Sequence, residues 1–487
     1  MSVRLRRRLL VVAVVGLASF GVAAALLVRG WAGARRNSDE WFVVKPYLQL
    51  GDAPASPSAP TASLELLWQG YDRDESWSVE VQGALGKAWS KAAAPTVRRV
   101  AVWGIKPRRL YRTSLRDLAL GAEHAYRVRL GTKVVFEASA RAPRPLGASH
   151  RFVAFGDGGA GTPGQRAVAF QIGRARPDLL LITGDIAYMK GRLTDYDEKF
   201  FPVYNNDDDL PSQGAPLMRS IPFFATPGNH DMVYRNLDDV PDALAYFLIW
   251  AQPLNGPMPD LTSKHWPVAV GAEDRVQAFR KAAGAAYPRM ANFSFDYGDA
   301  HWTVLDANTY VDFGAPELRE WLARDLAAAQ GAAWRFVAFH HPPFHSSKAH
   351  ADDQRTRLLV ELLEQGRVDL VFTGHVHNYQ RTYPLRFVAE KGVVPGGNVA
   401  GRWELDREFD GVTRTQPKGV IYLVTGAGGA RLYDTDLHDD ASSRLEFTTR
   451  FVSNTHSFTV ADVEPKRVMV RQVSDQGQEL DRFVVTK

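Results

Sequence analysis

The sequence contains no cysteine among its 487 residues. This absence excludes a disulfide framework and any metal site built on thiolates, so a bound metal would need nitrogen and oxygen ligands. No internal repeat with a period of about 20–50 residues is visible, which excludes solenoids and propellers. A chain of this length is too long for one ordinary domain and predicts a large core domain with a smaller module.

The sequence also lacks a basic face of the kind that binds nucleic acids. Its formal net charge is +5, but residues 1–36 contain seven arginines and no acidic residue, which leaves −2 for the remaining chain. Lysine and arginine are not concentrated elsewhere, so no nucleic-acid-binding surface is predicted.

One long hydrophobic run, residues 9–28, follows a basic tail at residues 1–8 and precedes a linker at residues 29–42. Twenty helical residues span about 30 Å, and the run exceeds the ~7–15 apolar residues of an ordinary signal peptide. It predicts a transmembrane anchor, and the excess of arginine before it favours a cytoplasmic N-terminus with the body outside the cytoplasm. Two alternatives stay open: a signal cleaved near Ala34, which would release a secreted form, and a twin-arginine export signal.

The pattern of apolar and polar residues changes once in the rest of the chain. Residues 43–143 hold short alternating segments separated by Gly, Pro, Asp and Ser, which predict a small all-β sandwich. Residues 147–487 alternate strands and helices, which predicts an α/β domain with helix-covered sheets. Insertions rich in Asp, Pro and Gly, at residues 191–222 and 255–289, predict loops that shape substrate entry. Strands are expected at residues 150–155, 178–183, 334–339 and 368–373, and helices at 165–176, 316–330 and 353–365.

Five short motifs place Asp, Asn, His and Tyr at the ends of predicted strands or in the loops that follow. Open α/β sheets place their sites at the carboxyl ends of strands, and glycine beside a candidate ligand permits a sharp turn there. The motifs therefore predict one dinuclear metal site. They are Gly156-Asp157-Gly158-Gly159, Gly184-Asp185-Ile186-Ala187-Tyr188, Gly228-Asn229-His230-Asp231, His340-His341 and Gly374-His375-Val376-His377.

The order and content of these motifs resemble the metallophosphoesterases, and Tyr188, three residues after Asp185, narrows the likeness to the purple acid phosphatases. Many metallophosphoesterases carry a histidine ligand where this chain has Gly159, and Tyr188 is its natural replacement. The resemblance implies an α/β sandwich of two mixed sheets flanked by helices, preceded by a fibronectin-III-like domain at residues 43–143 and the membrane anchor. It extends to residues 45–51, 287–290, 292–298, 381–384 and 425–429.

The resemblance also implies the roles of individual residues. One metal would be bound by Asp157, Asp185, Tyr188 and His377, and the other by Asp185, Asn229, His340 and His375, with Asp185 bridging. A phenolate suits Fe(III), so the implied centre is Fe(III) paired with Fe(II), Zn(II) or Mn(II). His230 and His350 match the outer-sphere histidines of the family, which would supply a proton to the leaving alkoxide.

Other polar residues near the motifs are predicted to have supporting roles. His341 and His345 are expected to be structural or to support the ligands, and His301 to be packed in a strand. Asp231 is expected to orient His230 or a neighbouring ligand.

The predicted function is an exported, membrane-anchored phosphomonoesterase acting on small-molecule or macromolecular phosphate esters. The ions would lower the pKa of a bound water, neutralise the phosphoryl oxygens and hold the attack in line. A phosphodiesterase or nucleotide hydrolase on the same centre is the first alternative, because the ions do not distinguish monoesters from diesters. The second alternative is a binding or adhesion protein with a catalytically inactive phosphatase fold, and the complete ligand set argues against it.

Overall fold

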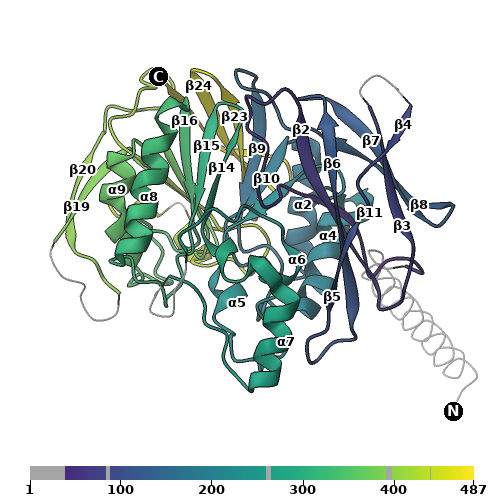
Figure 1. Cartoon of the computed structure of the whole chain (residues 1–487). Helices are drawn as coiled ribbons and strands as arrows, with labels where there is room; N and C mark the ends of the chain where they lie inside the picture. Colours follow the sequence, from purple (N-terminus) through teal and green to yellow (C-terminus); the bar gives the residue numbers. More distant parts are fainter. Residues whose placement is uncertain (1–38, 84–87, 259–264, 391–396, 439) are drawn as a thin grey trace, which may run out of the picture.

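The computed structural model describes residues 39–83, 88–258, 265–390, 397–438 and 440–487. Within these ranges two large sheets face each other and helices lie on the outer sides (Figure 1). A search of the described residues finds no helix with the length and hydropathy needed to cross a membrane. The predicted anchor at residues 9–28 lies outside the described residues and stays a prediction.

Eight N-terminal strands occupy the region predicted to be all-β, and they form two packed layers. Trp68 and Trp77 lie across the core between the layers, with ring centroids 5.7 Å apart. Residues along the strand that begins at Trp77 alternate between buried and half-buried, as expected for a strand with one face in a core. One layer contains β1 (Val44–Gln49), β2 (Ala62–Tyr71), β5 (Thr96–Val100) and β6 (Arg108–Leu118), and the other β3 (Trp77–Gln82), β4 (Trp89–Lys91), β7 (Glu123–Leu130) and β8 (Lys133–Arg141).

The first N-terminal layer continues into the sheet that follows it in sequence. Gln49 of β1 aligns in parallel with Phe223 of the strand β13, so the joined sheet has ten strands in the order β25-β24-β23-β9-β10-β13-β1-β2-β6-β5. The pairing satisfies backbone groups that a free strand edge would expose. The predicted modules are therefore joined by a shared sheet in addition to the linker. The new strands are β9 (His150–Phe155), β10 (Leu179–Ile182), β13 (Phe223–Ala225), β23 (Ser457–Glu464), β24 (Arg467–Ser474) and β25 (Glu479–Thr486).

The second large sheet has seven strands and packs face to face against the first. Phe152 of β9 contacts the rings of Trp302, Phe336 and Phe372, with centroid distances of 4.8, 5.5 and 5.4 Å. Its central strands are parallel and its edges antiparallel, so both large sheets are mixed. In order, the strands are β14 (Phe293–Tyr297), β15 (Ala300–Val304), β16 (Trp334–Ala338), β17 (Leu370–Thr373), β21 (Ile421–Thr425), β18 (Tyr379–Thr382) and β22 (Thr448–Val452).

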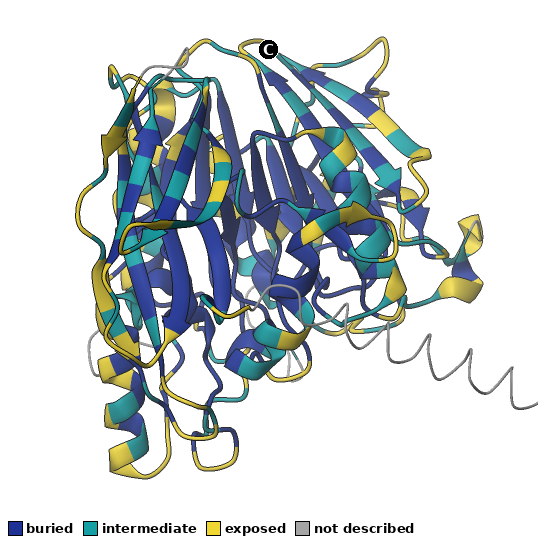
Figure 2. Ribbon diagram, turned by 90° about the vertical axis from the view of Figure 1, so that its right-hand side faces the viewer, coloured by how far each residue is buried: buried dark blue, intermediate teal, exposed yellow. Residues whose placement is uncertain are grey.

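Helices cover the outer faces of both sheets. Phe152 faces the core between the sheets, whereas the next residue, Val153, faces the helix layer, because successive side chains of a strand point to opposite faces. The central strands are buried throughout and exposed residues lie on the outer surfaces (Figure 2). The expected α/β arrangement of mixed sheets is confirmed. The covering helices are α2 (Pro163–Ala175) and α4 (Phe201–Tyr204) on the ten-stranded sheet, and α8 (Pro316–Ala328) and α9 (Val360–Gln365) on the other.

The two insertions contain more regular structure than the sequence analysis predicted. Residues 255–289 contain the helix α7 (Glu273–Ala283), so the expectation of loops was wrong there. The signals were present: acidic residues in its first turn, Arg280 and Lys281 in its last, and Gly284 at φ 60° just after its end. Residues 191–222 contain the short helices α3 (Leu193–Asp195) and α4, and the hairpin of β11 (Asn205–Leu210) and β12 (Gly214–Pro216). Outside the insertions lie the short helix α6 (Tyr246–Ile249) and the hairpin of β19 (Leu385–Ala389) and β20 (Gly401–Leu405).

Arg98 of β5 adds a second link between the N-terminal strands and these insertions. Its guanidinium donates to the carbonyl of Leu248 at 2.8 Å and to that of Ala283 at 2.5 Å. These carbonyls belong to the last turns of α6 and α7, where unpaired backbone oxygens favour a cation. One side chain thus holds two helix ends against the N-terminal layer.

Candidate metal centre

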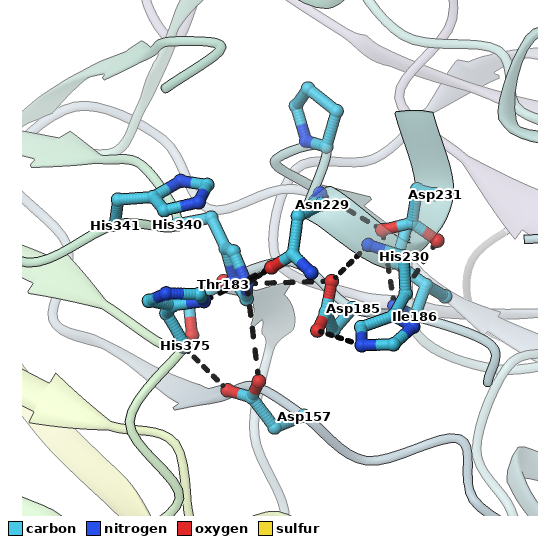
Figure 3. Close-up of polar contacts among 12 residues, drawn as sticks. Asp157, Thr183, Asp185, Ile186, Asn229, His230, Asp231, His340, His341 and His375 are labelled. Atoms are coloured by element: carbon cyan, nitrogen blue, oxygen red, sulfur yellow. Dashed lines mark hydrogen bonds and ion pairs between the residues drawn. The ribbon is translucent and has the colours of Figure 1, made fainter. Parts of the chain in front are cut away.

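All seven predicted ligands come together where strands of the two sheets end (Figure 3 shows five of them). Parallel strands end at the same edge of a sheet, so loops far apart in sequence meet there. Asp157 follows β9, Asp185 and Tyr188 follow β10, Asn229 begins the short helix α5 (Asn229–Met232) after β13, His340 follows β16, and His375 and His377 follow β17.

Three of these residues adopt backbone conformations that are unfavourable for residues other than glycine. Asp157, Asp185 and His375 have φ values of 58°, 50° and 68°, in the left-handed region. Such conformations persist only where surrounding structure holds them, and they cluster at functional sites. His375 is held in part by its own N–H, which donates to Asp157 Oδ2 at 2.9 Å.

Gly159 explains why this chain has no histidine in its first motif. A Cβ atom at residue 159 would lie 1.9 Å from the Ile186 carbonyl oxygen, so no side chain fits there. The Tyr188 N–H donates to the Gly159 carbonyl at 2.9 Å, which packs the Tyr188 loop directly against this glycine. The absence of a side chain at residue 159 therefore lets the Tyr188 loop approach this closely.

One group of donor atoms consists of Asp157 Oδ1, Tyr188 Oη and His377 Nε2. The Tyr188 oxygen lies 3.0 Å from each of the other two, which are 3.3 Å apart. His377 Nδ1 donates to the Arg431 carbonyl at 2.7 Å, so in the neutral ring the Nε2 lone pair faces the group. Burial and the charges of Asp157 and Asp185 raise the pKa of Tyr188 well above its ordinary value. A phenolate therefore needs a cation beside it.

A second group consists of Asn229 Oδ1, His340 Nε2 and His375 Nδ1. Both imidazole nitrogens lie 3.0 Å from the amide oxygen. His340 Nδ1 donates to the Thr183 carbonyl at 2.7 Å, so a neutral His340 would point an Nε2 lone pair at the oxygen of Asn229. Lone pairs that converge in this way repel one another, so a cation between them would be stabilising.

Asp185 connects the two groups. Its Oδ1 lies 3.4 Å from His340 Nε2, and ligand atoms of Asp157, Asp185 and His340 all lie within 4.8 Å of one another. Burial alone would lower the pKa of His340, but the carboxylates of Asp185 and Asp157 outweigh it and raise that pKa to about 10. The carboxylates of this site therefore favour a positive charge between them. Oxygen and nitrogen donors at such spacing fit two hard or borderline metal ions.

Of the two predicted proton donors, His230 lies beside Asp185 and His350 beside His375. His230 Nδ1 donates to the Met189 carbonyl at 2.6 Å, and its Nε2 lies 3.8 Å from Asp185 Oδ2. His350 is exposed, and its ring centroid lies 4.1 Å from that of His375. Burial and the charge of His377 lower the pKa of His350.

The supporting residues have distinct surroundings. The buried ring of His341 lies 4.3 Å from that of His375, and burial and His340 hold its pKa well below the ordinary value. Asp231 accepts from the N–H of Gly228 at 2.9 Å and of Ile186 at 3.2 Å, so it joins the backbone of two motifs. His345 is also buried, and an Asp353 carboxylate oxygen lies 3.8 Å from His341 Nε2.

His301 lies outside the site, in β15, as the expectation of a packed strand histidine implies. Its Nδ1 lies 2.7 Å from Asp296 and its Nε2 3.1 Å from Asp325. Burial would lower the pKa of His301, but these two carboxylates raise it to about 9. The ring therefore links Asp296 of β14 with Asp325 of α8.

Sequence analysis missed the groups that orient the ligands. The carbonyls of Thr183 and Arg431 fix the ring tautomers of His340 and His377, and a backbone carbonyl carries no residue-type signal. The ring of Tyr433 stacks on His377 at 4.0 Å with an interplanar angle of 9°. Its only sequence signal was its place just after the motif at residues 425–429.

Comparisons with known proteins also indicate a phosphoesterase. Residues 150–379 match the calcineurin-like phosphoesterase family, and all seven predicted ligands lie in this range. Purple acid phosphatase 23 of Arabidopsis thaliana is 32% identical over 154 residues, 30% of this chain and 28% of the relative. A nucleotide pyrophosphatase/phosphodiesterase of Hordeum vulgare is 25% identical over 264 residues, 52% and 58% of the two chains. The match thus spans under a third of the first relative and just over half of the second.

A solved structure shares the fold over most of the chain. The purple acid phosphatase from yellow lupin seeds superposes with a TM-score of 0.64 at 18% identity, covering 91% of this chain and 74% of that one. The family match, the relatives and the shared fold together support a metallophosphoesterase. Within that class, the chain is purple acid phosphatase-like.

Proposed function

We propose that the protein is a dinuclear-metal phosphomonoesterase that hydrolyses phosphate esters. The observation that carries this proposal is the convergence of two donor groups joined by Asp185, inside the phosphoesterase-matched region. The ligands proposed are those of the sequence analysis: Asp157, Asp185, Tyr188 and His377 for one ion, and Asp185, Asn229, His340 and His375 for the other.

Bound cations at this site would lower the pKa of a water molecule and neutralise the phosphoryl oxygens. The chain itself supplies orientation and proton transfer. The Met189 carbonyl accepts from His230 Nδ1, which leaves His230 Nε2 facing Asp185, where the doubly protonated ring would give its Nε2 proton to a departing oxygen. His350 lies beside His375 and is proposed as the second outer histidine.

The test is hydrolysis of 4-nitrophenyl phosphate by the full chain after reconstitution with iron and zinc. We expect turnover that chelation abolishes and that returns when the metals are restored, because the proposed site cannot act without its cations. A metal-loaded protein that leaves the ester intact would reject the function. Bis(4-nitrophenyl) phosphate, tested in parallel, distinguishes a phosphodiesterase, which the barley relative represents by name.

We also propose that residues 43–143 form a fibronectin-III-like module before a catalytic domain at 147–487, and that the anchor at residues 9–28 holds both outside the cytoplasm. The two-layer N-terminal packing and the apolar run support these proposals. A phosphatase-independent reporter fused after Lys487 should work only on the outer side of the membrane. Reporter signal confined to the cytoplasm would exclude this topology, and a soluble product beginning near Ala34 would indicate the cleaved-signal alternative.

A further inference from the structure

A group of apolar side chains at the surface lies beside His230, and the proposed function alone gives it no role. Met189 is 56% exposed and Val233 is 46% exposed. Single exposed apolar residues are normal on protein surfaces. Met189 supplies the carbonyl that accepts from His230, and Val233 and the half-buried Tyr234 follow His230 in the chain; we refer to these three side chains as the apolar rim.

Hydrogen bonds hold the backbone of the apolar rim close to His230. The bond from His230 Nδ1 to the Met189 carbonyl brings the loop after β10 against α5. Val233 and Tyr234 follow His230 by three and four positions, the spacing of neighbours on one face of a helical turn. The Val233 N–H donates to the Asn229 carbonyl at 2.9 Å, so the turn reaches Val233, and the Tyr234 ring centroid lies 6.4 Å from that of His230.

The position of His230 determines what the apolar rim can contact. A group that protonates a departing oxygen stands within hydrogen-bond reach of that oxygen. The carbon skeleton attached to the oxygen must then extend past the same ring. Because His230 Nε2 faces Asp185 at 3.8 Å, a skeleton that leaves the site on the His230 side would pass the positions of Met189 and Val233.

We propose that the apolar rim binds the leaving group, so that the enzyme prefers monomeric phosphate monoesters of apolar alcohols over those of small or polar ones. This inference rests on the proposed function and names the substrate class of its site. The stabilisation comes from apolar area removed from water, so it grows with the length of an alkyl leaving group.

Ethyl and octyl phosphate test the inference, because their leaving alkoxides have similar basicity and differ in apolar area. With octyl phosphate kept below its micelle concentration, we expect the metal-loaded full chain to show a kcat/KM for octyl phosphate at least about tenfold above that for ethyl phosphate. The Met189→Gln, Val233→Thr double variant keeps the side-chain sizes and adds polarity, so this ratio should fall to within about threefold. Val388→Thr is the matched control, since Val388 is 67% exposed on β19, which lies at the left edge of the molecule and away from α5 at the lower centre (Figure 1).

The outcomes separate the two proposals. Turnover of both esters with a ratio near one, or a ratio that the double variant retains, overturns the inference and leaves the proposed function standing. A ratio that the Val388→Thr variant lowers equally also overturns it, because the effect would then not belong to the apolar rim. No turnover of these esters or of 4-nitrophenyl phosphate rejects both proposals.

Discussion

Replacing Asp185 with Asn should abolish turnover of 4-nitrophenyl phosphate, with a loss of more than about a thousandfold, and should lower the metal content from two ions per chain to one or fewer. Removing a residue that only supports a ligand costs about 10–100-fold, so the ligand proposed to hold both ions should cost more. The isosteric amide keeps the acceptor oxygen that the His230 N–H uses at 2.8 Å, so the fold should survive. Asp185→Ala should give the same loss.

The measurements are steady-state kinetics, metal analysis and a thermal melt on the same samples. Asp274→Asn is the control, because Asp274 is exposed in the first turn of α7, outside the motifs. It should leave both rate and metal content near those of the parent. Asp185→Asn activity within tenfold of the parent, or an unchanged metal content, would show that Asp185 does not bridge the ions.

Replacing Tyr188 with Phe should remove the visible colour of the iron-loaded protein and weaken iron retention by at least about tenfold. A tyrosinate bound to Fe(III) transfers charge to the metal in the visible range, so the parent should be purple to pink. The change deletes only the oxygen that lies 3.0 Å from both Asp157 Oδ1 and His377 Nε2 and leaves the ring in place. Since that phenol resists ionisation without a cation, the colour reports metal binding itself.

Tyr433→Phe provides the matched control for this prediction. Its ring stacks on His377, but its oxygen is not among the proposed ligands, so the colour should persist in the control. Spectra and iron content that stay the same in Tyr188→Phe would mean that Tyr188 is only a packed aromatic. The centre would then hold a different pair of metals.

The elements that carry the site could be predicted closely from the sequence. The strand expected at residues 150–155 is β9 with the same bounds, and the helix expected at residues 316–330 is α8, which ends two residues earlier. A fully apolar run predicts a buried strand, and apolar residues at helical spacing predict a helix, so few other secondary structures fit these segments. The helix α7 lies in an insertion whose Asp, Pro and Gly content is typical of loops. The signal for a helix was the placement of acidic residues in its first turn and basic residues in its last.

The sequence by itself determined which residue types could form the centre and in which loops they lie, because the side chains of Asp157, Asp185 and His340 define the chemistry that a metal would meet. Only the tertiary structure decided their orientation. The tautomer of His340 depends on a carbonyl 157 positions away in the chain, and the entry of Tyr188 depends on the absence of a side chain at Gly159. Such contacts join backbone atoms of distant loops, and a backbone atom is the same in every residue, so the sequence carries no local record of them.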